Sequence, residues 1–228
     1  IDSAESRGLI KPGDTIVEPT SGNTGVSLAM MARLRGYHLK AVMPASVSSE
    51  RVQILEAFGA EPIFSDGDKG TNESILVAES IAKEHPSYYM PYQYGSEANP
   101  RAHFETTGPE IVRDMPDVDV FVAGLGTGGT LMGVGRALHD HNPNVRVVAV
   151  APHPDDVVQG LRSLEHGFIP PILNLDELDA RLLVEADEAF SWTKQLLNQA
   201  GIFAGVSSGA VLAGARRVAA STEKGNVV

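Results

Sequence analysis

The sequence predicts an α/β protein of two lobes, in which largely parallel sheets are flanked by helices. Short runs rich in β-branched residues alternate with longer segments of helical period along the 228 residues, and this alternation is typical of parallel strands joined by helices. Several of the runs, such as VDVFVAG (118–124) and VRVVAVA (145–151), are apolar nearly throughout, which indicates strands buried on both faces. The polar stretch GSEANP (95–100) is predicted to be a linker between a smaller lobe, 1–95, and a larger lobe, 96–228.

The positions of the individual strands and helices are predicted from these β-branched runs and from the segments of helical period. Strands are expected at 14–17, 39–44, 62–65, 88–92, 118–124, 145–151 and 180–186. Helices are expected at 24–36, 48–58, 72–84, 101–113, 129–139, 187–200 and 208–219. The stretch 151–171 has many Pro and Gly residues and little periodicity, so it is predicted to be a functional loop region.

Composition narrows the function classes. A formal net charge of -11 disfavours nonspecific attraction to nucleic acid or anionic membranes. Cysteine is absent, which excludes disulfides and thiolate chemistry and fits a reducing, cytoplasmic compartment. No apolar run approaches the ~20 residues that span a bilayer. A metal site is not expected, because His139 and His141 stand two apart at a helix end and do not share a face.

A first anion site is predicted at EPTSGNTG (18–25), between a strand and a helix. The first N–H groups of a helix have no intrahelical partner, and the helix dipole favours negative charge there. Thr20, Ser21 and Thr24 add hydroxyl donors, and Gly22 and Gly25 are expected to let a ligand approach the backbone. A small anion such as a carboxylate or phosphate fits best, whereas a simple N-cap would need only one such residue.

A second anion site is predicted at GLGTGGT (124–130), again between a strand and a helix. Its glycines match the G-x-G-x-x-G pattern of dinucleotide sites, but such sites expect an acid at the end of the next strand. Here that strand ends in Ala151 and Pro152, which argues against a nicotinamide oxidoreductase. What remains is a phosphate cup, and the alternative is a glycine-rich contact between helix and sheet. A third helix start, GVSSGA (205–210), carries a pair of serines that would ordinarily be read as caps.

In combination these segments resemble the cysteine synthase family (O-acetylserine and O-phosphoserine sulfhydrylases), which are fold type II pyridoxal-phosphate enzymes with a tryptophan synthase β-like fold. EPTSGNTG is similar to the family's substrate-carboxylate loop, GTGGT to its cofactor-phosphate loop, and GVSSGA to the segment with its pyridine-nitrogen serine. The stretch 92–111 is similar to a further family segment, and all four occur in the family's order over essentially the whole chain. The segment GLRSLEHGF (160–168) resembles the actinobacterial type that accepts O-phosphoserine.

The resemblance implies roles for single residues. Pyridoxal 5'-phosphate would be the cofactor, with Asn23 at its ring hydroxyl, Ser207 at its pyridine nitrogen, and its phosphate held by Gly126, Thr127, Gly128, Gly129 and Thr130. The amino-acid substrate would be gripped at its carboxylate by Thr20, Ser21, Gly22, Thr24 and Gln93. Arg162 could pair with the phosphate of O-phosphoserine, although a solvated loop arginine near Glu165 is an equal alternative.

The resemblance also implies a lysine that carries the cofactor, in a Ser-x-Lys-Asp-Arg-type motif. None of the chain's lysines stands in that context, so the lysine is expected upstream of Ile1, and the chain is expected to be a fragment that is also clipped after Val228. No catalytic residue is therefore assigned within it.

The implied reaction is a transferase reaction of cysteine biosynthesis, a β-replacement on O-phosphoserine or O-acetylserine with a sulfur donor. Free sulfide, thiosulfate or a small sulfur-carrier protein are possible donors, and relatives are usually homodimers. Alternatives are a cystathionine β-synthase, a serine/threonine dehydratase-type lyase, or a non-catalytic pseudo-enzyme or binding subunit. TSGNTG together with Gln93 favours the synthase.

Overall fold

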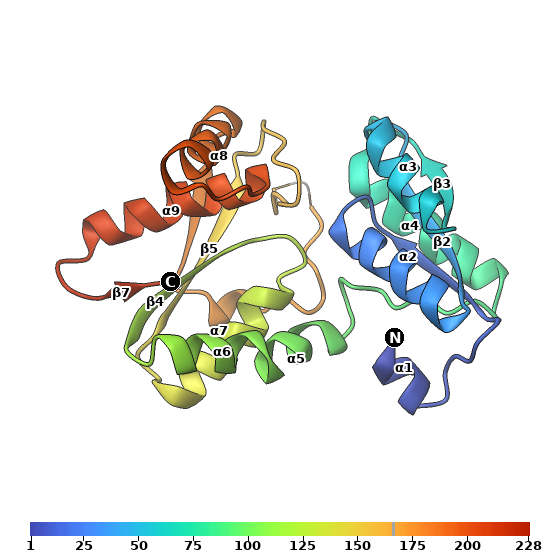
Figure 1. Ribbon diagram of the computed structural model, residues 1–228, viewed down its shortest axis with the longest axis horizontal. Helices are drawn as coiled ribbons and strands as arrows, with labels where there is room; N and C mark the ends of the chain where they lie inside the picture. Colours follow the sequence, from blue (N-terminus) through green and yellow to red (C-terminus); the bar gives the residue numbers. More distant parts are fainter. Residues whose placement is uncertain (166) are drawn as a thin grey trace. The chain divides into compact units, whose positions relative to one another are not determined.

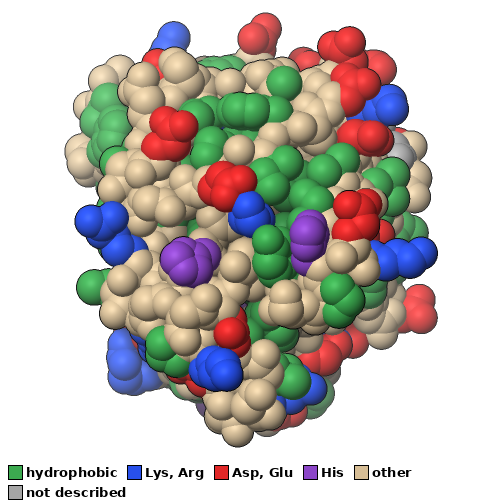
Figure 2. All heavy atoms as spheres, turned by 90° about the vertical axis from the view of Figure 1, so that its right-hand side faces the viewer, with side chains coloured by type: hydrophobic (Ala, Val, Ile, Leu, Met, Phe, Trp, Pro, Cys, Tyr) green, Lys and Arg blue, Asp and Glu red, His purple; other side chains and the backbone are tan. Residues whose placement is uncertain are grey.

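The computed structural model describes residues 1–165 and 167–228. It divides into two compact units, Ile1–Gln93 and Tyr94–Val228 (Figure 1). Within the described residues, no helix has the length and apolar character needed to cross a membrane. Acidic and basic side chains are scattered among apolar ones on the face shown in Figure 2.

Unit 1 is built on a three-stranded parallel sheet of order β1-β2-β3. The strands are β1 (Thr15–Pro19), β2 (His38–Pro44) and β3 (Glu61–Ser65). The helices are α1 (Asp2–Ser6), α2 (Asn23–Arg35), α3 (Ser49–Ala57) and α4 (Gly70–Glu84). Neighbouring residues of β1 enter different cores, because successive strand side chains alternate between faces: Ile16 packs with Leu55 of α3, and Val17 packs with Ala78 of α4. Helices therefore pack on both faces of this sheet.

Unit 2 contains a four-stranded parallel sheet of order β6-β5-β4-β7. Its strands are β4 (Val118–Gly124), β5 (Arg146–Pro152), β6 (Ala180–Val184) and β7 (Asn226–Val227). Its helices are α5 (Ala98–Glu105), α6 (Thr107–Asp114), α7 (Gly129–His141), the 3₁₀ turn η1 (Leu175–Glu177), α8 (Ala186–Ala200) and α9 (Val206–Ser221). Phe121 packs with α7, whereas Val120 packs with α8 and α9, so helices cover both faces of this sheet (Figure 1). The α/β class with parallel sheets is therefore confirmed.

Two element predictions are wrong. The stretch 88–92 forms no strand and makes only an isolated bridge between Tyr89 and Ile16, because prolines stand where a longer ladder would need N–H donors. The expected single helix 101–113 is two helices, α5 and α6. They are separated at Thr106, whose φ of -126° and ψ of -73° lie outside the helical region.

The close contact between α5 and α7 depends on Gly133. A Cβ atom at that position would lie 2.1 Å from the carbonyl oxygen of Pro100 in α5. The absence of a side chain therefore lets the two helix backbones touch. This contact fixes α5 beside the first turn of α7, and both helices contribute to the site in unit 2.

Candidate active site

The first predicted anion loop lies in unit 1, at the point where β1 ends and α2 begins. Thr20 is buried, and its N–H donates to the carbonyl of Val42 at 2.8 Å, so the loop leaves the sheet in a fixed direction. Gly22 is the N-cap of α2, and the helix begins at Asn23. The carbonyl of Ser21 accepts a hydrogen bond from the Arg51 guanidinium at 2.9 Å. The loop thus presents short polar groups around a helix start, the geometry that small anions favour.

The two glycines of this loop differ in role. Open space surrounds the position where Gly22 would carry a side chain, as expected for a residue that a ligand approaches. A Cβ atom at Gly25 would instead lie 2.9 Å from Thr20 Cγ2 and 3.4 Å from Leu55 Cδ2. Gly25 therefore serves packing between α2 and the end of β1, and the expectation that it exposes backbone to a ligand is wrong.

Gln93 lies beside the same loop. Its side-chain nitrogen donates to the carbonyl of Pro19 at 3.0 Å, next to Thr20. Its backbone N–H donates to Glu18 Oε1 at 2.9 Å, and the N–H of Tyr92 donates to Glu18 Oε2 at 2.7 Å. Within unit 1, Gln93 is therefore hydrogen-bonded to the residue that precedes Thr20, and its joint role with Ser21, Gly22 and Thr24 stays a prediction.

Glu18 is the buried acid of this region, with no exposed surface. Burial raises the pKa of its carboxyl group to about 7, although the hydrogen bonds from Gln93 and Tyr92 act in the opposite direction. A substantial fraction of Glu18 is therefore protonated at neutral pH, unlike an exposed glutamate.

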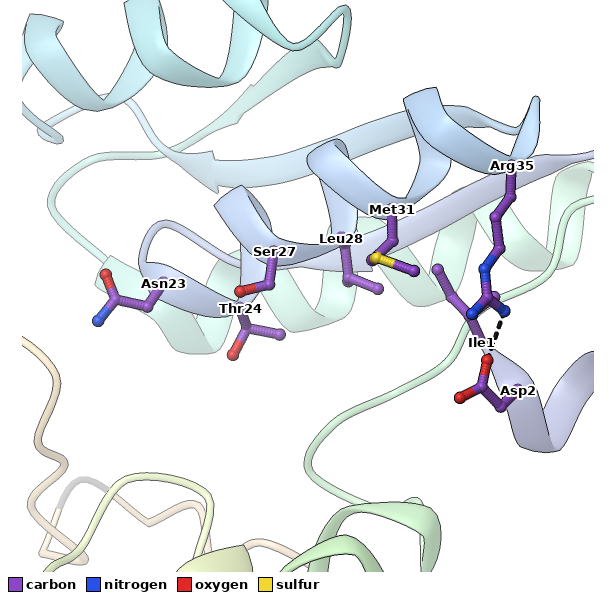
Figure 3. Close-up of a pocket in the computed structure, with 8 residues that line it drawn as sticks. All are labelled: Ile1, Asp2, Asn23, Thr24, Ser27, Leu28, Met31 and Arg35. Carbon is purple, nitrogen blue, oxygen red and sulfur yellow. Dashed lines mark hydrogen bonds and ion pairs between the residues drawn. The ribbon is translucent and has the colours of Figure 1, made fainter.

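Asn23 lies at one end of a hollow of about 450 Å³ along α2. Residues spaced by four share one side of a helix, so Asn23, Ser27, Met31 and Arg35 line it in a row (Figure 3). The polar end lies where the helix begins, and the far end is closed by an ion pair between Arg35 and Asp2. The amide of Asn23 is exposed and accessible to a ligand.

The second predicted anion loop follows β4 in unit 2 and leads into α7. Gly128 has a φ of 89°, in the left-handed region, and a Cβ atom there would lie 2.9 Å from Leu173 Cδ1. A Cβ atom at Gly126 would lie 3.0 Å from the carbonyl oxygen of Gly160. Bare backbone is therefore required at both positions, immediately before the first N–H groups of a 13-residue helix.

Side chains of α5 and α6 orient the two hydroxyl groups of this loop. Asn99 donates to Thr127 Oγ1 at 2.9 Å. His103 bridges two threonines, with Nε2 at 3.2 Å from Thr130 Oγ1 and Nδ1 at 3.0 Å from Thr107 Oγ1. Burial lowers the pKa of His103, which favours the neutral ring, in which one nitrogen donates and the other accepts.

Ser207 belongs to the first turn of α9 and lies close to this loop through Gly160. Its Oγ is 3.4 Å from the position of a Cβ atom at Gly160, the residue whose carbonyl abuts Gly126. Val211, one turn along the same helix, approaches Gly124 at the end of β4. The predicted phosphate loop and the predicted pyridine-nitrogen serine are thus on the same edge of the sheet, where its strands end. Open parallel sheets bind their ligands at this edge.

Arg162 is also anchored at the phosphate loop. Its backbone N–H donates to the carbonyl of Leu125 at 2.7 Å. The guanidinium carbon lies 5.0 Å from the ring centroid of Tyr94 and 4.8 Å from that of Phe168, so the cation packs against two aromatic rings that themselves meet edge to face. The Glu165 carboxylate is bound by Arg181 and Ser163, and the choice between a phosphate-binding Arg162 and a solvated loop arginine near Glu165 stays a prediction. His166, in the same segment, lies outside the described residues.

Comparison with known proteins places the chain in a family. The family model for pyridoxal-phosphate dependent enzymes matches residues 1–228. A cysteine synthase from Staphylococcus aureus (strain Mu50 / ATCC 700699) is 41% identical over 237 residues, which cover 100% of this chain and 76% of the relative.

Solved structures give the same result. O-ureido-L-serine synthase superposes with a TM-score of 0.90 at 38% identity, covering 99% of this chain and 74% of that one. O-acetyl serine sulfhydrylase isoform 3 from Entamoeba histolytica superposes with a TM-score of 0.89 at 34% identity, covering 100% and 71%. The chain therefore belongs to the family of pyridoxal-phosphate dependent enzymes, and its relatives include cysteine synthases.

The residues of unit 2 fit the phosphate of that cofactor. The loop that follows β4 combines side-chain-free positions, two hydroxyl groups fixed by Asn99 and His103, and a helix start. These are the groups that bind a phosphate dianion in proteins. Gly126, Thr127, Gly128, Gly129 and Thr130 could hold the phosphate, and Ser207 is near enough to contribute to the same site.

Several residues that shape the site have no recognisable signal in the sequence. Arg51 of α3, and Asn99 and His103 of α5, each bind a residue of one of the loops, and such partners are not indicated by local sequence pattern. The importance of Glu18 could have been inferred from the sequence, since a charged residue stands between Val17 and Pro19 in a predicted buried strand. A buried charge without a functional or structural partner would be costly.

The pKa of Glu18 predicts how stability depends on pH. The folded protein holds this proton more tightly than the unfolded chain, whose ordinary pKa is 4.5. Glu18 therefore lowers the free energy of unfolding as pH rises from about 4.5 to 7, by up to about 3 kcal/mol. In Glu18→Gln, which cannot ionise, this loss should disappear. Urea unfolding of both proteins at pH 5 and pH 8 measures the difference, and parallel pH profiles would contradict the assignment.

The phosphate loop predicts a second effect. Thr130→Val keeps the shape of the side chain and removes the hydroxyl group, so it should weaken binding of pyridoxal phosphate by about 10- to 100-fold, the value of one hydrogen bond to a charged group. Affinity for pyridoxal, which has no phosphate, should not change. Absorbance titration measures both, and Thr107→Val, on the other side of His103, is the matched control. Equal weakening for both ligands would place Thr130 away from the phosphate.

Proposed function

We propose that this protein is a cysteine synthase, which replaces the β-substituent of an O-activated serine with sulfur. The proposal is carried by one observation: a chain that aligns over its whole length with a cysteine synthase has, in each unit, a polar loop at the helix start that follows a strand. In unit 1 this loop suits a carboxylate, and in unit 2 it suits a phosphate.

Unit 1 would bind the amino-acid substrate. Thr20, Ser21, Gly22 and Thr24 surround the start of α2, and Gln93 is hydrogen-bonded to the same loop through Pro19. Backbone N–H groups, hydroxyl groups and an amide are donors suited to both oxygens of a carboxylate. Binding at this loop would orient the substrate so that its α-carbon and β-substituent project away from the carboxylate site.

Unit 2 would hold the cofactor through the phosphate loop, with Ser207 at the pyridine nitrogen, and Asn23 of unit 1 would bind the ring hydroxyl. When bound, pyridoxal phosphate supplies the electron-accepting system that makes the α-proton of an amino acid labile. Ser207 is a neutral hydrogen-bonding partner, so it does not enforce a protonated ring as an aspartate would. This favours loss of a β-substituent over transamination.

Over the whole reaction, the substrate's β-carbon loses its bond to oxygen and gains a bond to sulfur, and the α-proton that leaves is returned. With O-phosphoserine the leaving group is phosphate, and with O-acetylserine it is acetate. The Arg162 backbone is hydrogen-bonded to Leu125 of the phosphate loop, and its guanidinium packs against the rings of Tyr94 and Phe168. A rigid fork of this kind favours a phosphate dianion over a neutral acetyl ester, so we propose O-phosphoserine as the preferred substrate.

The proposal extends to the protein's setting. A homodimer in the cytoplasm, supplied with sulfur as free sulfide, as thiosulfate or by a small sulfur-carrier protein, is what the resemblance to cysteine synthases implies. Sizing of the complete encoded protein, and its activity with each sulfur donor, test these parts separately.

Substitution of Arg162 tests the choice of substrate. Arg162→Ala should lower kcat/KM for O-phosphoserine by about 10- to 100-fold, because one charge-assisted contact is lost, and should change kcat/KM for O-acetylserine far less. Arg181→Ala, which removes the neighbouring partner of Glu165, is the control and should affect neither. Equal losses with both esters would show that Arg162 stabilises its own loop and does not recognise the phosphate group of O-phosphoserine.

A further inference from the structure

The edge of β1 changes its mode of pairing at two prolines. Tyr89 N–H donates to the carbonyl of Thr15 and Val17 N–H donates to the carbonyl of Tyr89, both at 2.9 Å, as in a parallel ladder. The next step of such a ladder would need N–H groups two residues further along each segment. Those positions are Pro91 and Pro19, which have no N–H group. The backbone ladder therefore cannot continue toward the substrate loop.

Beyond the end of this backbone ladder, the Glu18 carboxylate accepts the next N–H groups of the neighbouring segment. Its two oxygens accept the consecutive N–H groups of Tyr92 and Gln93 at 2.7 and 2.9 Å. Tyr92 has a φ of 56°, the one left-handed residue other than glycine in the described chain. Such a conformation is unfavourable for a tyrosine by about 1 kcal/mol. It turns successive N–H groups toward one point, which is the geometry of an anion-binding nest.

The hydrogen bonds that the Glu18 carboxylate accepts come from this turn. Glu18 is completely buried, and among the described residues the hydrogen bonds to it come from Tyr92 and Gln93, with a contribution from the Gln93 side chain. A buried acid is costly unless its oxygens are satisfied, so its presence fixes the backbone of residues 92 and 93. Because Gln93 also binds Pro19, the same turn sets where its amide lies beside Thr20.

We infer that Glu18 is a positioning residue for substrate binding, which holds the turn at residues 92 and 93 so that Gln93 meets the carboxylate of the amino acid. This inference rests on the proposed function of the loop at Thr20 to Thr24. Glu18 itself does not touch the substrate. It acts as an internal hydrogen-bond acceptor that preorganises a site for an external anion.

Kinetics of Glu18→Gln test this role in the complete encoded protein. An amide offers one oxygen acceptor and turns an NH₂ group toward the second N–H, so one of the two bonds is lost. KM for the amino-acid substrate should rise by about tenfold, with kcat changed little, because the substitution removes binding and not chemistry. Glu18→Asp, which keeps the charge on a shorter side chain, should restore part of the affinity.

Hydrogen exchange supplies a readout independent of activity. The amides of Tyr92 and Gln93 should exchange at least tenfold faster in Glu18→Gln than in the unaltered protein. Ile16→Val is the matched control, since Ile16 is equally buried in the same strand and its truncation lowers stability without reaching the turn. In that variant, KM and exchange at both amides should stay unchanged.

The outcomes separate this inference from the proposed function. If the unaltered protein turns over O-activated serine, but Glu18→Gln leaves KM and both amide exchange rates unchanged, the positioning role is wrong and the proposed function stands. If the control raises KM as much as Glu18→Gln does, Glu18 is only structural. If the unaltered protein fails to turn over O-activated serine, the proposed function fails whatever the amides do. Should Glu18→Gln not fold, unchanged KM and exchange in Glu18→Asp would overturn the inference.

Discussion

Helix N-termini that follow the ends of parallel strands are the constraint on which this molecule's candidate site depends. In a parallel sheet each strand is followed by a connection that turns back over the sheet, so helix starts collect at one edge. The first N–H groups of each helix have no partner within it. In unit 1 this edge carries the loop before α2, and in unit 2 it carries the loop before α7 and the start of α9. Both units thus present unpaired donors where anions bind.

Each helix start is fitted to its role by the residues around it. Glycines leave room where other atoms approach the backbone closely, as the Thr20 side chain does at Gly25 and the Gly160 carbonyl does at Gly126. Partners from other helices hold the remaining polar groups in place, as Arg51 does for Ser21 and His103 for Thr130. In unit 1 a buried carboxyl group also contributes, because Glu18 accepts hydrogen bonds from the turn that carries Gln93. Preorganisation of this kind reduces the entropy lost when a ligand binds.

Much of the fold could be predicted because its signals are local. Nearly continuous apolar runs identified β4 and β5, and hydroxyl and glycine clusters identified the loops before α2 and α7. The strand expected at 88–92 does not form, and the reason is again local. Its aromatic and apolar residues favour a strand, but Pro91 and Pro19 lack the N–H groups that a longer ladder needs. Long-range partners could not be predicted: Glu18 binds a residue 75 positions away, and Asn99 reaches Thr127 from another helix.

Two loops of this chain are proposed to recognise two different anions, and backbone amide NMR of the protein, titrated first with pyridoxal phosphate and then with O-phosphoserine, distinguishes them. Pyridoxal phosphate should shift the amide signals of Gly126 to Thr130, and the amino acid should then shift those of Ser21, Gly22, Thr24 and Gln93. Shifts confined to other parts of the chain, or the same set of amides responding to both ligands, would contradict this proposal.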